Sequence, residues 1–141
     1  MNIDGINNGI VIDHIKAGNG FKIYNSLKLN ELECSVAIIT NAKSEKMGKK
    51  DIIKIDQDID IDLNVLGYLD PDITINIVKN KKIIDKYNVQ IPTELVNIIK
   101  CKTPSCITST ERALPHIFLL ADKDKKMYRC KYCDTLEQES I

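Results

Sequence analysis

The sequence predicts an α+β protein in two parts, a two-layer sandwich followed by a small β-rich domain that folds around a metal ion. Three observations lead to this prediction. In the N-terminal part, segments with strand-like spacing of apolar residues alternate with segments of helix-like spacing. Four of the five cysteines then fall in the last third of the 141 residues. The apolar content of 43% and the charged content of 28% are ordinary for a folded chain and exclude extensive disorder.

The strands and helices of the first part are predicted from the spacing of their apolar residues. Alternation or short β-branched runs predict strands at residues 9–15, 34–40, 49–55, 73–77 and 83–89. Near-helical spacing predicts helices at residues 21–29 and 58–69. The resulting order is strand, helix, two strands, helix and two strands. That order is the ferredoxin-like βαββαβ sandwich with an extra strand.

Local sequence adds detail to the strands. Regular alternation in the first strand puts Val11 and Ile15 on one face and His14 on the other, with Asp13 and His14 on opposite faces. The uninterrupted apolar run at residues 34–40 suits a strand that is buried on both faces. Cys34, at the start of this run, is expected to be a small buried side chain.

The second helix has its own boundary signals. Asp60 or Asp62 is expected to cap its first turn, because a carboxylate can accept hydrogen bonds from the free N–H groups there. The Asp70-Pro71 pair is expected to end it, because the residue before a proline avoids the helical conformation.

The C-terminal cysteines have the spacing of a metal site. Cys101 and Cys106 form a C-x4-C pair, and Cys130 and Cys133 form a C-x2-C pair. Two such pairs supply four thiolates to one tetrahedral zinc ion, and four thiolates leave no open position for a catalytic water. The expected cofactor is therefore one structural Zn²⁺ per chain. Iron is the alternative metal for an all-sulfur site, and a redox C-x2-C pair is the alternative chemistry.

Zinc is expected to be a folding requirement of the C-terminal part. A segment of about forty residues rarely buries enough surface to fold unaided. Metal binding contributes on the order of 10–16 kcal/mol to such a segment, so metal uptake and folding become one event. Short strands are expected within it at residues 117–120 and 127–128.

Charge and hydropathy narrow the functional classes. The formal net charge is zero, which argues against a protein that grips phosphate backbones non-specifically, so no nucleic-acid partner is expected. No apolar stretch approaches the roughly 20 residues that cross a bilayer, and residues 1–9 lack the features of a signal peptide. A reducing, cytoplasmic location with no membrane partner is the expectation, since paired cysteines there hold metals more often than they form disulfides.

Catalytic signals are weak in this sequence. Asp13 and His14 are adjacent, but His116 belongs to the cysteine-rich part and no serine has the setting of a nucleophile. Asp13 and His14 are usually structural in such a position, and Lys54 in an apolar strand is usually a surface lysine. Two alternatives remain open: a free-standing zinc ribbon that binds nucleic acid or another protein, and an enzyme that uses Asp13 and His14.

Three motifs together resemble a known family. Residues 9–15 read GIVIDHI, residues 48–55 read GKKDIIKI, and residues 130–133 read CKYC. In this order, and with the two cysteine pairs, they resemble the regulatory chain of aspartate carbamoyltransferase, an enzyme of pyrimidine biosynthesis. The resemblance covers nearly the whole chain.

The resemblance implies a subunit without catalysis of its own. Residues 1–92 are then expected to bind nucleotide effectors, CTP and ATP and in some members UTP, and to form a homodimer with a second regulatory chain. Residues 93–141 are expected to be the zinc-binding domain that docks on the catalytic chain. The implied mechanism is allosteric control of that catalytic chain.

Matching the motifs residue by residue also implies an effector site. The resemblance assigns the base's exocyclic amine to Asp13, the triphosphate to His14 and Lys86, and the base or ribose to Lys54. The remaining positions that match the pocket are Asn76, Ile84, Ile6 and Gly5. The arm before residue 9 is short and lacks a lysine. Near the cysteines, Thr103, Ser105 and Asp134 stand where the family often has Asn, Asn and Glu.

Overall fold

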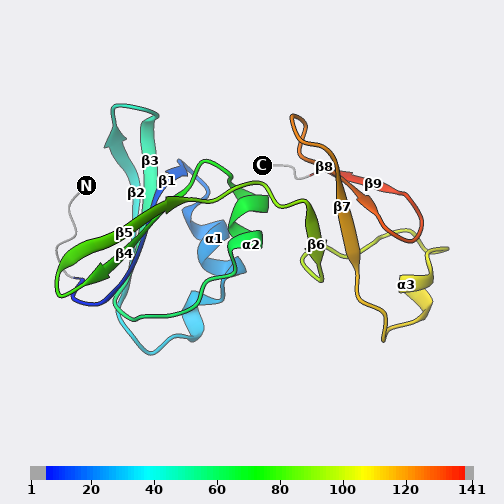
Figure 1. The fold of residues 1–141 in the computed structure, drawn as a ribbon, viewed down its shortest axis with the longest axis horizontal. Coiled ribbons are helices and arrows are strands. Elements are labelled where there is room, and N and C mark those ends of the chain that lie inside the picture. The colour runs from blue at the N-terminus through cyan, green and yellow to red at the C-terminus, as the bar shows by residue number, and fades with distance from the viewer. Residues whose placement is uncertain (1–5, 139–141) are drawn as a thin grey trace. The chain divides into compact units, whose positions relative to one another are not determined.

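The computed structural model describes residues 6–138. The chain divides into two compact units, and the boundary along the sequence lies between Gln90 and Ile91. The N-terminal unit holds a five-stranded antiparallel sheet with the order β2-β3-β1-β4-β5. Its strands are β1 (Gly9–Lys16), β2 (Val36–Ser44), β3 (Gly48–Ile55), β4 (Thr74–Lys79) and β5 (Lys82–Asn88). The first four strands have the ferredoxin-like order, and β5 adds the extra edge strand, which confirms the predicted fold (Figure 1).

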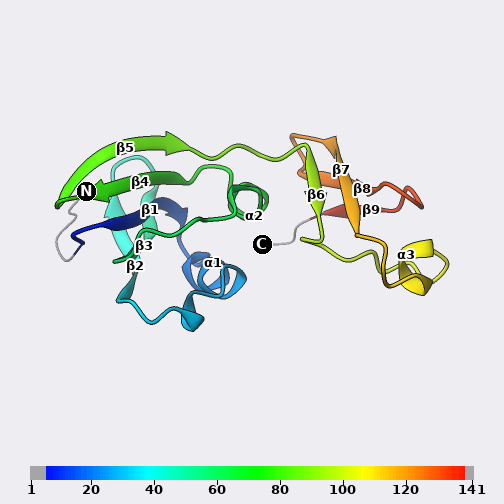
Figure 2. The same cartoon turned by 60° about the horizontal axis from the view of Figure 1, so that its bottom comes forward.

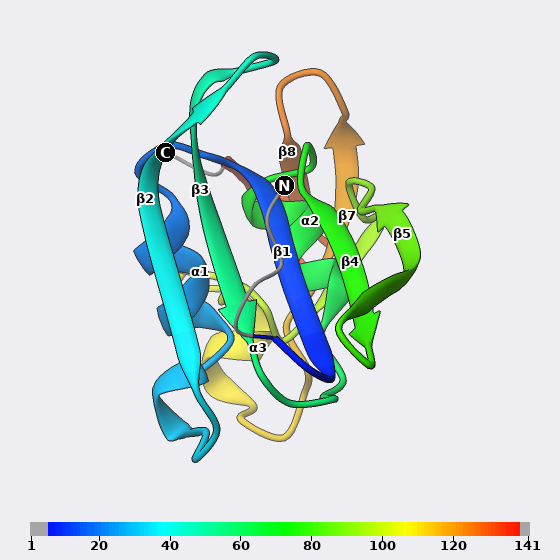
Figure 3. The same ribbon diagram turned by 90° about the vertical axis from the view of Figure 1, so that its left-hand side faces the viewer.

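Two helices cover one face of this sheet. Helix α1 (Gly20–Ser26) and helix α2 (Leu63–Leu69) lie on the same side of the strands (Figure 2). The core between the layers consists mainly of isoleucine and leucine: Ile12, Ile15, Ile23, Ile53, Ile55, Leu66, Ile73 and Ile75 are all at most 1% exposed. The other face, which carries no helix, is called the open face here and is turned toward the viewer in Figure 3.

Helix α2 begins at Leu63 and is shorter than the predicted range 58–69, but one of its two predicted caps and its predicted end are confirmed. The side chain of Asp62 accepts hydrogen bonds from the backbone N–H groups of Asn64 and Val65, at 3.0 and 3.4 Å. These bonds satisfy donors that have no partner within the helix. The helix ends at Leu69, directly before the Asp70-Pro71 pair.

Helix α1 is shorter than its predicted range. It ends at Ser26, and the 3₁₀ turn η1 (Leu29–Glu31) follows it. Between them Lys28 adopts a left-handed conformation, with φ of 55°, which breaks the helix. Apolar spacing alone missed this break because Leu29 remains buried in the 3₁₀ turn.

The prediction that residues 34–40 form a strand buried on both faces is wrong. Strand β2 lies at the edge of the sheet, runs on to Ser44, and alternates partly and fully exposed residues. Cys34 is likewise only partly buried. An uninterrupted apolar run does not distinguish a central strand from an edge strand whose outer side is available to a partner.

A bulge in β1 changes which residues share a face. The register shifts between Ile12 and Ile15, and His14 has a left-handed φ of 58°. Beyond the bulge Ile15 pairs with Asp51 and therefore joins Ile12 on the helix face, whereas Val11 lies on the open face. The predicted pairing of Val11 with Ile15 on one face is wrong because alternation fails at the extra residue.

Asp51, on the helix face, binds the turn that follows β1 and a residue of β2. Its carboxylate is 1% exposed and accepts hydrogen bonds from the backbone N–H groups of Gly18, Gly20 and Asn41, at 3.0, 2.9 and 3.1 Å. Asn41 is itself the left-handed residue of a second bulge, in β2. At Gly20 an added Cβ would lie 2.9 Å from an Asp51 oxygen, so the close approach requires glycine.

The C-terminal unit is a four-stranded antiparallel sheet with the order β6-β7-β8-β9. Its elements are β6 (Glu94–Val96), α3 (Ile107–Thr110), β7 (Ile117–Asp122), β8 (Met127–Cys130) and β9 (Leu136–Gln138). The strands predicted at residues 117–120 and 127–128 are thus confirmed. The core contains Leu95, Phe118 and Tyr128, all fully buried. Burial raises the pKa of Tyr128 to about 12, and its hydroxyl donates to the Pro92 carbonyl at 2.6 Å.

Among the described residues, no helix has the length and apolar character that a transmembrane span requires.

Asp51→Ala is expected to destabilise the N-terminal unit by about 3 kcal/mol or more. The substitution leaves three backbone N–H groups without their acceptor, and each buried unsatisfied donor costs roughly 1–3 kcal/mol. Urea unfolding of the zinc-loaded chain, followed by circular dichroism, measures the loss. Asp58→Ala removes an exposed carboxylate and is expected to change the free energy of unfolding by less than about 0.5 kcal/mol. Equal effects of the two substitutions would contradict the role given to Asp51.

Candidate functional site

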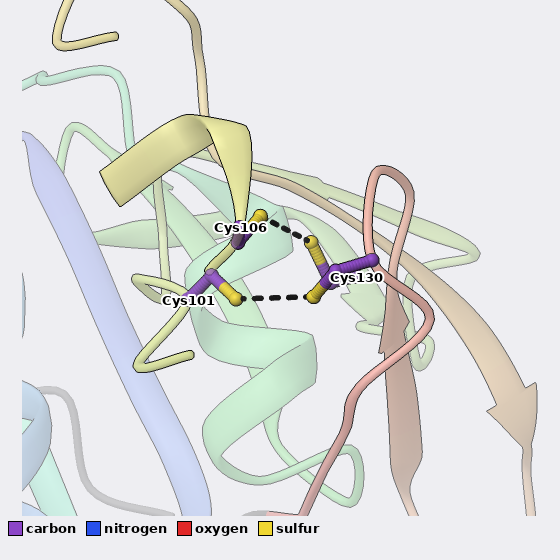
Figure 4. Close-up of side chains that lie close together, drawn as sticks. Cys101, Cys106 and Cys130 are labelled. Carbon is purple, nitrogen blue, oxygen red and sulfur yellow. Dashed lines mark hydrogen bonds between the residues drawn. The ribbon is translucent and has the colours of Figure 1, made fainter. Parts of the chain in front are cut away.

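Four cysteines meet in the C-terminal unit. Cys101 and Cys106 come from the segment before and at the start of α3, and Cys130 and Cys133 come from the end of β8 and the turn that follows it. Their four Sγ atoms all lie within 4.8 Å of one another. Figure 4 shows Cys101 and Cys106 facing Cys130 from the opposite side of the cluster.

The sulfur geometry fits a tetrahedral zinc ion. Zn–S bonds of about 2.3 Å in tetrahedral geometry place sulfurs about 3.8 Å apart. The Sγ atoms of Cys101 and Cys133 are 3.5 Å apart, and those of Cys106 and Cys130 are 3.8 Å apart. Three of the four residues are buried and Cys133 is partly buried, so the cluster is largely shielded from water. The four cysteines can hold one structural Zn²⁺.

Polar neighbours support the sulfurs. The hydroxyls of Thr108 and Thr135 lie 3.1 and 3.2 Å from the Sγ atoms of Cys106 and Cys133, respectively. Hydrogen bonding with Thr135 lowers the pKa of Cys133 to about 6, whereas burial raises the pKa of Cys130 to about 12. A buried thiolate therefore needs the charge of a metal ion, which is the role that zinc would have here.

A second group of polar residues lies on the open face of the N-terminal sheet. Strand pairing aligns Lys54 with Val11, Val11 with Asn76, and Asn76 with Lys86, so that one row crosses β3, β1, β4 and β5. Cross-strand partners share a face, so this row brings together three of the eight residues assigned to the effector site. Asn76 is only 3% exposed.

The bulge brings Asp13 and His14 to this same face. Asp13 pairs with Thr74 of β4, and the Nδ1 atom of His14 lies 3.1 Å from the Thr74 hydroxyl oxygen. Thr74 donates its hydroxyl hydrogen to Asn88 Oδ1 at 3.1 Å, so its oxygen accepts from His14 Nδ1–H. The expectation that Asp13 and His14 lie on opposite faces is therefore wrong, because the bulge breaks the alternation between them.

Lys50 is a residue of this group that the sequence analysis did not select. Its Nζ atom lies 3.0 Å from Asp13 Oδ1, and its side chain is 12% exposed. The alternation of β3 provides the signal, since Lys50 and Lys54 have the same parity in one strand. Asp13 also accepts from the backbone N–H of His14 at 2.7 Å.

Several cations lower the pKa of His14. Burial has the largest effect, the Asp13 carboxylate acts in the opposite direction, and three lysines lower the pKa further. These lysines are Lys50, Lys46 and Lys86. Opposite charges therefore compete at His14, and a bound anion would act in the same direction as Asp13 and raise the pKa.

The remaining assigned residues lie around the row. Ile84 is the extra residue of an irregularity between β4 and β5 and is 57% exposed. Ile6 is 5% exposed and clusters with Val11, Ile52 and Val78 on the open face. Gly5 lies outside the described residues.

The fold and the two groups of residues define a class of protein, a chain with an αβ unit and a cysteine-rich metal-binding unit. Residues 1–90 match the family model "Aspartate carbamoyltransferase regulatory chain, allosteric domain", and residues 93–141 match its "metal binding domain". The chain belongs to the aspartate carbamoyltransferase regulatory chain family. It is a regulatory subunit and has a metal-binding domain.

Three relatives illustrate this membership. The aspartate carbamoyltransferase regulatory chain of Clostridium tetani is 54% identical over 137 residues, 96% of this chain and 95% of the relative. That of Clostridium acetobutylicum is 54% identical over 136 residues, 96% of this chain and 93% of the relative. That of Bifidobacterium longum is 40% identical over 134 residues, 95% of this chain and 96% of the relative.

Cys106→Ser is expected to abolish zinc binding and to unfold the C-terminal unit, while the N-terminal unit stays folded. A serine hydroxyl replaces one thiolate of a closed four-sulfur site, and the unit is too small to fold without the metal. Elemental analysis measures zinc per chain, and amide NMR spectra report the folding of each unit. Cys34→Ser, outside the cluster, is the control and is expected to keep one zinc per chain. Full zinc occupancy in Cys106→Ser would refute the assignment.

Proposed function

We propose that this chain binds nucleoside triphosphate effectors on the open face of its N-terminal sheet and transmits their effect to an aspartate carbamoyltransferase catalytic chain. The observation that carries the proposal is the combination on one face of the buried Asp13 carboxylate, His14 and the lysines around them. Lysines act as point charges for phosphate, and a carboxylate accepts hydrogen bonds from an amino group. CTP and ATP carry both groups, and UTP carries the triphosphate alone.

Each residue has a distinct proposed role. His14 and Lys86 bind the triphosphate, and Lys50 and Lys46 add positive charge beside them, as their effect on His14 supports. Asp13 accepts from the amino group of the base. Lys54 contacts the base or the ribose from β3, and Asn76, Ile84 and Ile6 line the same pocket. Gly5, outside the described residues, is proposed to complete its wall.

The metal-binding unit is proposed as the docking unit for the catalytic chain. The names of the relatives and of the family support a regulatory chain in partnership with a carbamoyltransferase. Zinc would act on no substrate there. It would fix the two cysteine-bearing turns, and hence the surface around Thr103, Ser105 and Asp134 that contacts the partner.

A homodimer through β2 is proposed for the N-terminal unit. Strand β2 begins with seven uncharged residues, Val36–Ala42, and is an edge strand with exposed Ile39. The opposite edge strand, β5, carries two lysines and an aspartate, which discourage strand pairing. Antiparallel pairing of β2 with its copy satisfies twofold symmetry and extends the sheet.

The proposed location is the cytoplasm. None of the five cysteines forms a disulfide, which agrees with a reducing compartment.

Lys86→Ala is expected to weaken CTP and ATP binding by about tenfold, because it removes one charge-assisted contact to the triphosphate. Isothermal titration of the zinc-loaded chain measures the dissociation constants. Lys82→Ala on the same strand is the control, because Lys82 pairs with Lys79 on the other face and is expected to change affinity by less than about twofold. Identical affinities of both variants and the unsubstituted chain would refute the site.

His14 is expected to couple effector binding to protons. Its pKa is lowered in the free chain, and a bound triphosphate would raise it by stabilising the imidazolium. Binding therefore takes up a proton, so the affinity of the chain relative to His14→Gln is expected to rise as pH falls from about 8 to 6. The variant corrects for titration of the phosphate itself. A ratio of affinities that stays constant over this range would contradict the coupling.

Ile39→Lys is expected to shift the chain from dimer to monomer, because it puts a charge on the pairing edge. Analytical ultracentrifugation measures the mass. Tyr87→Lys is the matched control, since Tyr87 is similarly exposed. It is expected to leave the dimer intact because it lies on the opposite edge strand. Dissociation by Tyr87→Lys and not by Ile39→Lys would assign the interface to β5 instead.

A further inference from the structure

The C-terminal unit contains a cavity of about 520 Å³ that the proposed function does not use. It is lined by the end of the segment after β6, by α3, and by residues 112–116, which lead into β7. Its polar lining residues are Asn97, Lys100, Thr108, Arg112 and His116. The volume lies within the range of small-molecule sites.

Two of these side chains have their acceptor atoms occupied. Asn97 Oδ1 accepts the backbone N–H of His116 at 2.9 Å. His116 Nδ1 accepts the backbone N–H of Cys101 at 3.1 Å, so the imidazole hydrogen is on Nε2. What remains for a ligand is the amide NH₂ of Asn97 and the Nε2–H of His116. Both groups are donors.

The charged lining residues are both cations. Lys100 and Arg112 are exposed, and no ion pair involves either of them within residues 6–138. None of the described residues that line the cavity is acidic, although Glu111 precedes Arg112 in the chain. In a chain with zero net charge, this is a local excess of donors and positive charge without acceptors.

We propose that this cavity binds an oxyanion, a carboxylate or phosphate group, between Lys100, Arg112 and His116. Arginine binds such groups through two parallel N–H donors, and an imidazole N–H and an amide supply additional neutral donors. The group is either part of a free small molecule or a carboxylate side chain of the catalytic chain. Both sources present the same acceptor chemistry to the cavity.

Two residues that line the cavity are hydrogen-bonded to the cysteines of the metal cluster. His116 is hydrogen-bonded to the backbone N–H of Cys101, and the Thr108 hydroxyl lies 3.1 Å from Cys106 Sγ. An oxyanion on Nε2–H polarises the imidazole and strengthens the bond that Nδ1 accepts. The amide resonance of Cys101 therefore reports occupancy of the cavity.

The test uses the zinc-loaded full chain at constant ionic strength. Sodium phosphate and sodium succinate are titrated in turn while amide NMR spectra follow Cys101 and His116. Lys100→Gln and Arg112→Gln remove the two cations. Lys123→Gln and Arg129→Gln are the matched controls, since both are exposed and neither lines the cavity. Assembly with the purified catalytic chain is then measured for the same four variants.

Two results support the proposal and distinguish its sources. A saturable shift of Cys101 with phosphate or succinate, weakened about tenfold by Arg112→Gln and not by Arg129→Gln, identifies a free oxyanion. No saturable shift, together with about tenfold weaker assembly for Lys100→Gln and Arg112→Gln but not for the controls, identifies a carboxylate of the catalytic chain. If the cavity variants match their controls in both measurements, the proposal is overturned. CTP titration tests the N-terminal site separately, so the two proposals can fail independently.

Discussion

The bulge in β1 is the constraint on which the open face depends. An extra residue between Ile12 and Ile15 lets Asp13 and His14 lie on the same side of the sheet, where regular alternation would separate them. A non-glycine residue in the left-handed region is uncommon, and the surrounding structure must hold it there. The contacts of His14 itself are the hydrogen bond from its backbone N–H to Asp13 Oδ1 and the hydrogen bond between its Nδ1 atom and the Thr74 hydroxyl. The geometry of the site thus depends on the pairing of β1 with β4, which carries Thr74.

The open face combines one buried carboxylate with several lysines. Asp13 is 3% exposed and is offset by Lys50 at 3.0 Å, while further lysines surround the neutral imidazole of His14. Lysines that lie close together on one face repel one another, and this repulsion opposes folding. Asp13 offsets only part of it. A bound polyanion would remove that cost, so ligand binding is expected to stabilise the N-terminal unit by linkage.

Features that depend on short sequence separations were predictable. The cysteine pairs need only spacings of three and five residues, and the cap at Asp62 acts on the next turn, so both follow from local sequence. The succession of strands and helices along the chain was also predictable, because the spacing of apolar residues within each segment indicates a strand or a helix. The edge position of β2 and the bulge at His14 could not be predicted from the sequence, because each depends on which strands pair. The alternation of β3 puts Lys50 on the face of Lys54, but its contact with Asp13 depends on β3 lying beside β1 and could not be read from the sequence.

Allosteric control by this chain requires more than two binding sites. The proposed effector contacts all lie in the N-terminal unit, whereas the cysteine cluster and its cavity lie in the C-terminal unit. An effector can change a partner only if its free energy of binding differs between two arrangements of the assembly. Typical coupling free energies are about 1–3 kcal/mol, comparable to one or two charge-assisted hydrogen bonds. Contacts as few as those proposed for Lys86 or Arg112 are therefore sufficient in magnitude to carry the signal, provided that they form in one arrangement and not in the other.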